Sequence, residues 1–174
     1  MRGRPARAGL CLLLLALSGC GYHLLRYGAA LGDVRRVAIQ SFKNDSYEPG
    51  YELVVTDALL REFMRRGALQ VVKDPSQADL VLAGRVLPIR TVGRSFSSVD
   101  LALEYEVQVK LDLQVKRRDG TAVQLDENAL SDSELYTASA DVEAMRKNRQ
   151  EALHRLAGVL AERVHEALFE RLMP

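Results

Sequence analysis

The chain has 174 residues, and its 24 Lys and Arg almost balance its 23 Asp and Glu, so the formal net charge is +1. This balance excludes the strongly basic footprint of a protein that binds nucleic acid. The apolar fraction of 48% is ordinary for one globular domain.

The first nineteen residues have the organisation of a secretory signal peptide. Three arginines precede an apolar run at 10–17, which is too short for a stable transmembrane span, and the tetrapeptide Leu-Ser-Gly-Cys follows at 17–20. This ending resembles the bacterial lipobox, in which the cysteine thiol receives the lipid. We therefore expect cleavage before Cys20 and a covalent lipid on Cys20. The alternative is an ordinary cleavable signal that leaves an unpaired exported thiol.

Cleavage has three consequences for the mature chain. Loss of the three arginines changes the formal charge to −2, and loss of Cys11 leaves one cysteine and no internal disulfide. Several acyl chains on Cys20 would anchor the protein firmly to a membrane. Because the next residue is Gly21 and not Asp, the pattern favours the outer membrane. We expect a signal peptide at 1–19, a lipidated tether at 20–32 and a single α+β domain at 33–174.

The first half of the domain alternates short strands with one helix. Residues 34–42 predict a strand, and 43–50 a loop in which Asp45 or Ser46 caps the next element. Apolar residues at helical spacing predict an amphipathic helix over 51–66, ended by Gly67. A short strand at 69–72, a turn at 73–78 and a strand at 79–89 follow, with ladder pairing weakened at Pro88. Residues 90–100 read as a polar connection.

The dominant feature is strict alternation over 101–116. Every odd position is apolar, which predicts one strand of about 53 Å with a dry face and a wet face. The wet face is either solvated or meets a polar partner. The candidate partner-facing residues on it are Glu104, Glu106, Gln108, Lys110, Asp112 and Gln114.

The rest of the chain returns along this strand. A hairpin at 117–120 contains Asp-Gly, 121–136 predicts a weaker returning strand with a bulge at 127–128, and 141–172 predicts a long helix capped by Ser139. The predicted fold is α+β, a two-layer sandwich. Two helices pack on one face of a mostly antiparallel four-stranded sheet, with 69–72 as a short extra strand.

No constellation of catalytic residues is visible. The sequence has no phosphate-binding glycine loop, no H-E-x-x-H and no G-x-S-x-G. His154 and His165 lie about 16 Å apart on one helix, too far to share a metal, and His23 lies in the tether. Glu104 and Glu106 share a strand face, but nothing there desolvates them. We predict that the chain is not an enzyme and holds no metal and no cofactor other than the lipid on Cys20.

Five stretches together resemble the lipopolysaccharide (LPS)-assembly lipoprotein family, LptE. They are Cys20-Gly21-Tyr22-His23-Leu24, 37–42, 53–67, the strand Ala78-Asp79-Leu80-Val81-Leu82-Ala83-Gly84, and Glu134-Leu135-Tyr136-Thr137-Ala138 before the last helix. The resemblance implies two helices on a four-stranded sheet, and an outer-membrane protein that plugs the lumen of the barrel protein LptD. It implies a role in inserting LPS into the outer leaflet.

The resemblance also implies LPS binding through basic residues near one end of the domain. Two groups of candidates lie at opposite ends of the long strand, Arg90 and Arg94 in one segment and Lys116, Arg117 and Arg118 in the hairpin. Both groups could equally be solvated loop charges. Parts of the pattern are also similar to CsgG-like secretion subunits and to LpoB-type activators of peptidoglycan synthases. The irregular partner of the long strand argues against the first, and the short tether argues against the second.

Overall fold

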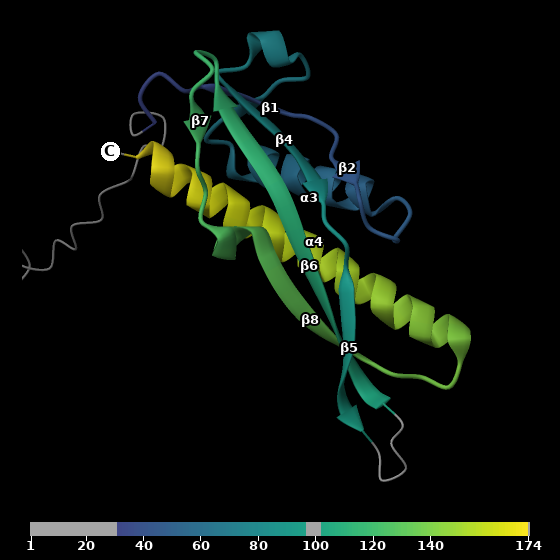
Figure 1. The fold of residues 1–174 in the computed structure, drawn as a ribbon. Coiled ribbons are helices and arrows are strands. Elements are labelled where there is room, and N and C mark those ends of the chain that lie inside the picture. The colour runs from purple at the N-terminus through teal and green to yellow at the C-terminus, as the bar shows by residue number, and fades with distance from the viewer. Residues whose placement is uncertain (1–30, 97–101, 174) are drawn as a thin grey trace, which may run out of the picture.

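Strand β6 (Ala102–Arg117) lies at the centre of the fold and is bonded along both edges (Figure 1). The structure is a computed structural model that describes residues 31–96 and 102–173. The predicted long strand is confirmed, displaced by one residue. Its partners are β4 (Leu80–Val86) and β5 (Arg90–Phe96) on one edge, and β7 (Ala122–Val123) and β8 (Ser131–Thr137) on the other.

Two helices cover one face of this sheet, and the long helix runs lengthwise along β6 (Figure 1). They are α3 (Tyr51–Arg66) and α4 (Val142–Leu172). Beneath them Val107, Val109, Leu111 and Val115 of β6 are at most 2% exposed. The dry face is therefore confirmed over most of the strand. No helix within 31–96 or 102–173 is long and apolar enough to span a membrane.

The two ends of β6 differ in how far α4 covers them. The end at Arg117 lies beside the start of the described chain and the C-terminal end of α4, and we call it the tether end (Figure 1). The opposite end, where β5 and β6 project beyond α4, is the distal end. Leu103, predicted to be buried, is 50% exposed there. The alternating pattern continues past the point where a helix covers it, so this part of the prediction is wrong.

The sheet is mixed, which corrects the prediction of a mostly antiparallel four-stranded sheet. Strand β1 (Arg36–Ile39) pairs in parallel with both β3 (Gln70–Val71) and β4, and β2 (Lys43–Asn44) also pairs in parallel with β4. The main strands bond in the order β3-β1-β4-β6, and β5 bonds to the same edge of β6 as β4, beyond Pro88. Parallel pairs arise because α3 and the 3-10 turn η1 (Pro75–Gln77) carry the chain back to the tether end before the next strand begins. The α+β class with two helices on one face is confirmed.

A β-bulge at Pro88 separates β4 from β5. The Leu87 amide donates to the Lys110 carbonyl over 3.0 Å, and the next paired residues are Arg90 and Gln108. Two residues thus oppose Val109 alone, which confirms the predicted weakening at Pro88. The prediction that 90–100 is only a connection is wrong, because 90–96 forms β5. The extra residue reverses which side chains face the helices, so the strand shows no apolar alternation in register with β4.

The returning segment is more broken than the predicted bulge at 127–128. Strand β7 ends after two residues, and a 3-10 turn η2 (Glu127–Leu130) precedes β8. The Asp126 carboxylate accepts the Asn128 amide over 2.7 Å and so begins this turn. The hairpin before it is confirmed, with Gly120 at a φ of 87°.

Helix α3 has the predicted bounds, and Gly67 ends it at a φ of 66° as predicted. The predicted caps Asp45 and Ser46 are wrong, because Gly50 precedes the helix at a φ of 81°. The cap of α4 is Asp141, whose carboxylate accepts the Ala144 amide over 3.0 Å.

The predicted cap of α4, Ser139, instead accepts the Asp141 amide. Both errors place the cap too early in a polar stretch where several residue types suit the position.

Candidate functional site

The outer face of the sheet, which we define as the face of β6 turned away from the helices, carries all the predicted partner-facing side chains. Every one is exposed except Glu106, which is half-buried. The outer face runs along the whole of β6 and mixes both signs of charge with amides. The set is Glu104, Glu106, Gln108, Lys110, Asp112 and Gln114.

Glu106 is the best-held group on this face. Its carboxylate accepts the Arg94 Nε over 2.7 Å and the Ser133 hydroxyl over 2.8 Å. The Ser133 hydrogen bond and then the Arg94 guanidinium hold the pKa of Glu106 below its ordinary value. Arg94 therefore faces the outer surface from β5, but in an ion pair.

Two apolar side chains flank Glu106, and the sequence analysis missed both. Val92 of β5 and Leu135 of β8 are in register with Glu106 on either side, and they are 50% and 49% exposed. In-register residues of neighbouring strands point to the same face. The outer face therefore has an apolar, charged, apolar row near its distal end. This row could be found from the sequence only if 90–96 were predicted as a strand, whereas the sequence predicted a connection there.

A hollow of about 430 Å³ lies on the outer face beside the bulge. It is lined by Leu87, Pro88, Arg90, Gln108, Lys110 and Ser131. Lys110 Nζ lies 3.4 Å from the exposed Glu127 carboxylate. Arg90 makes no ion pair with any residue of the described ranges. Of the cations that face this hollow, Arg90 is the one available to an anionic partner.

The second group of predicted cations lies at the tether end. Lys116 and Arg117 are in register with Val81 and Leu80, whereas Arg90 is in register with Gln108. Nine residues of strand span about 30 Å, so the two groups cannot form one site. The structure thus keeps Arg90 and Arg94 apart from Lys116, Arg117 and Arg118.

Arg118 is committed to Asp79. Its guanidinium lies 2.7 Å from the Asp79 carboxylate and also donates to the carbonyls of Gln77 and Ala78. Asp79 in turn accepts the amides of Arg35 and Arg36 over 2.9 and 2.8 Å. The carboxylate joins the starts of β1 and β4 to the hairpin, so Arg118 has a structural role.

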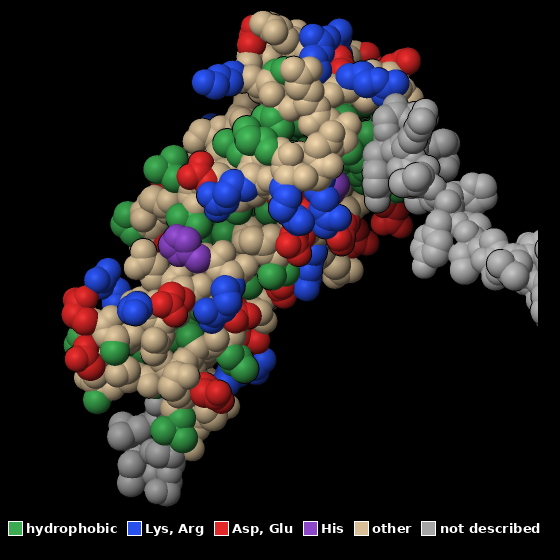
Figure 2. Space-filling view, turned by 180° about the vertical axis from the view of Figure 1, so that it is seen from behind, with side chains coloured by type: hydrophobic (Ala, Val, Ile, Leu, Met, Phe, Trp, Pro, Cys, Tyr) green, Lys and Arg blue, Asp and Glu red, His purple; other side chains and the backbone are tan. Residues whose placement is uncertain are grey.

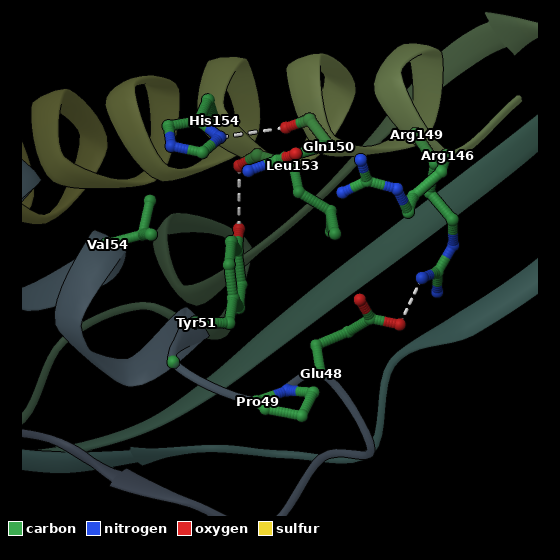
Figure 3. Close-up of a pocket in the computed structure, with 10 residues that line it drawn as sticks. Glu48, Pro49, Tyr51, Val54, Arg146, Arg149, Gln150, Leu153 and His154 are labelled. Carbon is green, nitrogen blue, oxygen red and sulfur yellow. Dashed lines mark hydrogen bonds and ion pairs between the residues drawn. The ribbon is translucent and has the colours of Figure 1, made fainter. Parts of the chain in front are cut away.

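A further cavity of about 280 Å³ lies between the start of α3 and the first half of α4 (Figure 3). Here Arg149 forms an ion pair with Glu48, and the Tyr51 hydroxyl donates to the Leu153 carbonyl over 2.9 Å. Burial raises the pKa of Tyr51 above its ordinary value. These polar groups satisfy one another, and their contacts join the 43–50 loop and the start of α3 to α4. The groups named here do not form a reactive pair.

No group of three potential metal ligands occurs within the two described ranges. The predicted lipidation residue, Cys20, and the rest of 1–30 lie outside them.

Comparison with known proteins identifies the family of this chain. The family model "LptE: Lipopolysaccharide-assembly" matches residues 34–168. The chain belongs to the LptE family. The resemblance to LptE is therefore confirmed, in preference to the CsgG-like and LpoB-type alternatives. The family is one of non-catalytic lipoproteins that take part in LPS assembly. The prediction that the chain is not an enzyme is therefore confirmed.

Solved structures show the same fold at low sequence identity. Rare lipoprotein B from Shewanella oneidensis is 14% identical, with a TM-score of 0.53 over 75% of this chain and 95% of that one. A minor lipoprotein from Acinetobacter baumannii is 16% identical, with a TM-score of 0.53 over 81% and 95%. Lipoprotein B from Nitrosomonas europaea is 13% identical, with a TM-score of 0.57 over 79% and 84%. No curated protein sequence gives a significant match.

Proposed function

We propose that this LptE-family protein is the plug and assembly partner of the outer-membrane barrel LptD, held at the membrane by a lipid on Cys20. The observation that carries the proposal is the open outer face of the sheet. The helices bury the other face, while a row of polar side chains along β6 stays exposed. The outer face therefore offers a surface for contact with a partner protein.

The outer face suits the inside of a barrel in chemistry and in length. The lumen of a transmembrane barrel is polar, and a plug that contacts it should be polar as well. Helix α4 has 31 residues, about 46 Å, close to the full thickness of a bilayer with its headgroups. Figure 2 shows the helix side of the molecule, where basic and acidic side chains are interspersed. The outer face and the helix side therefore both carry a mixture of positive and negative side chains.

The family's role in LPS assembly makes the phosphates of LPS a second contact. Among the five cations, Arg90 has the best setting for it, because it faces a hollow and makes no ion pair with any described residue. Arg94 and Arg118 are each held by a carboxylate, and Lys116 and Arg117 lie at the tether end. Arginine binds phosphate oxygens through paired N–H donors. Replacing Arg90 by Ala should weaken LPS binding. Replacing Arg61 of α3, which is exposed and makes no ion pair with any described residue, should not.

The decisive experiment is a pull-down of the tagged mature protein in mild detergent. We expect one barrel protein to co-purify in about equal amounts, and depletion of the protein to leave LPS in the periplasm or inner membrane. A Val92→Asp, Leu135→Asp variant should lose the barrel, because both residues border Glu106 on the outer face. A Leu53→Asp, Met64→Asp variant changes two residues of the same kind on α3 and should keep it. Recovery of a homo-oligomeric ring without a barrel would overturn the proposal.

A further inference from the structure

An apolar groove lies at the tether end, between the last turns of α3 and α4. It has a volume of about 280 Å³, and its floor is formed by Ala68, His165, Phe169 and Met173. Met173 remains 38% exposed. The groove lies outside the surface that the proposed function uses, since that surface is on the other face of the sheet.

His165 at this groove is an unusual residue for a core. It is 5% exposed, and its ring packs against Phe63 and Phe169 with centroid distances of 5.0 and 4.2 Å. Its Nδ1 atom is buried and has no hydrogen-bond partner among the residues that the structure describes. Buried polar atoms are nearly always satisfied, so an unsatisfied one calls for an explanation. A polar group from an additional segment at this place would satisfy it.

The described chain begins beside the groove. Leu31 and Val34 are buried in the core, and the Gln70 amide donates to the Arg35 carbonyl over 2.8 Å. Gln70 is two residues from Ala68 of the groove floor. In Figure 1 the start of the described chain and the end of α4 lie at the same end of the molecule. The segment before Leu31 therefore starts next to the groove.

We propose that the groove holds the segment Tyr22–Tyr27 of the same chain. Its sequence is Tyr-His-Leu-Leu-Arg-Tyr, which supplies four apolar or aromatic side chains in six residues. Tyr22 lies nine positions before Leu31, so the chain between them can reach about 30 Å when extended.

The chemistry of the rim matches the segment. Glu166 and Glu170 line the groove, and Arg66, which also lines it, pairs with Glu62 over 2.7 Å and with Glu166 over 3.4 Å. Arg26 of the segment has the complementary charge to Glu170, which forms no ion pair with any described residue. A tyrosine hydroxyl or an amide of the segment can donate to His165 Nδ1.

Docking would leave only Gly21 between Cys20 and the bound segment. The lipid would then be held at the tether end, with the distal end pointing away from it. This inference depends on neither the barrel partner nor LPS, so it can fail while the proposed function stands.

Two measurements on the lipidated protein in mild detergent, without the barrel, test the proposal. Trypsin cuts after Arg26, and docking should slow this cut about tenfold relative to an Ala68→Glu, Met173→Glu variant, whose charged groove no longer accepts the apolar side chains of the segment. A Met64→Glu variant on the exposed face of α3 is the matched control and should cut as slowly as the wild type. Equal cutting of the wild type and the groove variant would overturn the proposal.

The second measurement keeps the test independent of how the groove variant folds. A Leu24→Cys, Met173→Cys pair should form an intramolecular disulfide, while a Leu24→Cys, Leu53→Cys pair should not, because Leu53 lies at the other end of α3. Equal yields from the two pairs would overturn the proposal. Disulfide-linked dimers as the main product would also overturn it, because they would assign the groove to the segment of a second copy.

Discussion

The two ends of β6 differ in how their charged and apolar groups are used. At the tether end, Asp79 accepts two backbone amides and pairs with Arg118, and the buried Glu62 holds two arginines of α3. At the distal end, Leu103 and Phe96 are half-exposed and Arg90 has no ion pair with any described residue. Satisfied networks stabilise a fold, whereas exposed apolar groups and free cations mark contact surfaces. The tether end contributes stability, and the distal end is available to a partner.

The largest effect should come from breaking the sheet where the two ends meet. Val109 is fully buried opposite the bulge, so Val109→Asp places a carboxylate in the core and should cost at least about 4 kcal/mol of unfolding free energy. Gln108→Asp changes the neighbouring outer-face residue and should alter stability by less than about 0.5 kcal/mol. Urea unfolding of the two variants checks this. Similar losses would mean that the two faces of β6 are not distinct.

The next effect tests the tether end alone. Asp79→Ala leaves the amides of Arg35 and Arg36 without an acceptor and frees Arg118, so it should cost roughly 1–3 kcal/mol. The matched control is Asp57→Ala on the exposed side of α3, which should change the unfolding free energy little. A loss no greater than that of the control would show that the Asp79 contacts do not stabilise the tether end.

Acid should remove the same contribution. Burial by itself raises the pKa of Asp79, but the two amides and then the charges of Arg118 and Arg36 outweigh it and lower the pKa. Because the folded-state pKa lies below the unfolded value of about 3.9, the stabilisation is complete above that value. It is lost as the pH falls through the folded-state pKa. The unfolding free energy of the Asp79→Ala variant should therefore fall less between pH 4 and pH 2 than that of the wild type.

A third pair of variants applies one substitution to both ends. A Cβ at Gly84 would lie 2.6 Å from the Asp112 carbonyl oxygen and 2.7 Å from the buried ring of Phe42. Neither can yield cheaply, so Gly84→Ala should cost about 1–3 kcal/mol. A Cβ at Gly93 would lie 2.7 Å from the ring of Phe96, which is half-exposed and can turn away. Gly93→Ala should cost much less in thermal unfolding, and equal costs would remove the contrast between the ends.

Prediction from sequence succeeded where one face of an element is buried, and it failed for contacts such as that of Gly84 with Phe42. Strong periodicity gave the bounds of β6, α3 and α4 to within one or two residues, because burial on one face imposes a period that the chain must keep. The stretch 78–84 could be recognised as similar to a family, but the structural roles of its residues could not be predicted from the sequence. That Asp79 binds amides 43 and 44 residues away, and that Gly84 makes room for Phe42, depend on contacts between distant segments.

Prediction failed where a local irregularity reversed the pattern. The weakened pairing at Pro88 was expected, but the bulge there and its consequence for 90–96 were not, because one extra residue exchanges the faces of everything after it. Arg90 was therefore assigned to a loop, and Val92 was not considered as a surface residue. The parallel pairing of β1 was missed for a related reason, since the direction of a neighbouring strand leaves no trace in a short apolar run.

The smallest expected effect concerns α4, which spans both ends. Gly158 lies in the middle of this helix, is exposed, and a Cβ added there would meet nothing within 4 Å. Glycine inside a helix costs about 0.5–1 kcal/mol relative to alanine, so Gly158→Ala should stabilise the protein by that amount. The midpoint of thermal unfolding should rise by about 1–4 °C, and because α4 packs along most of β6, hydrogen exchange should slow along both halves of the helix. A rise in protection confined to the tether end would mean that the distal half of α4 opens separately, and the contrast between the ends would then extend from contacts to dynamics.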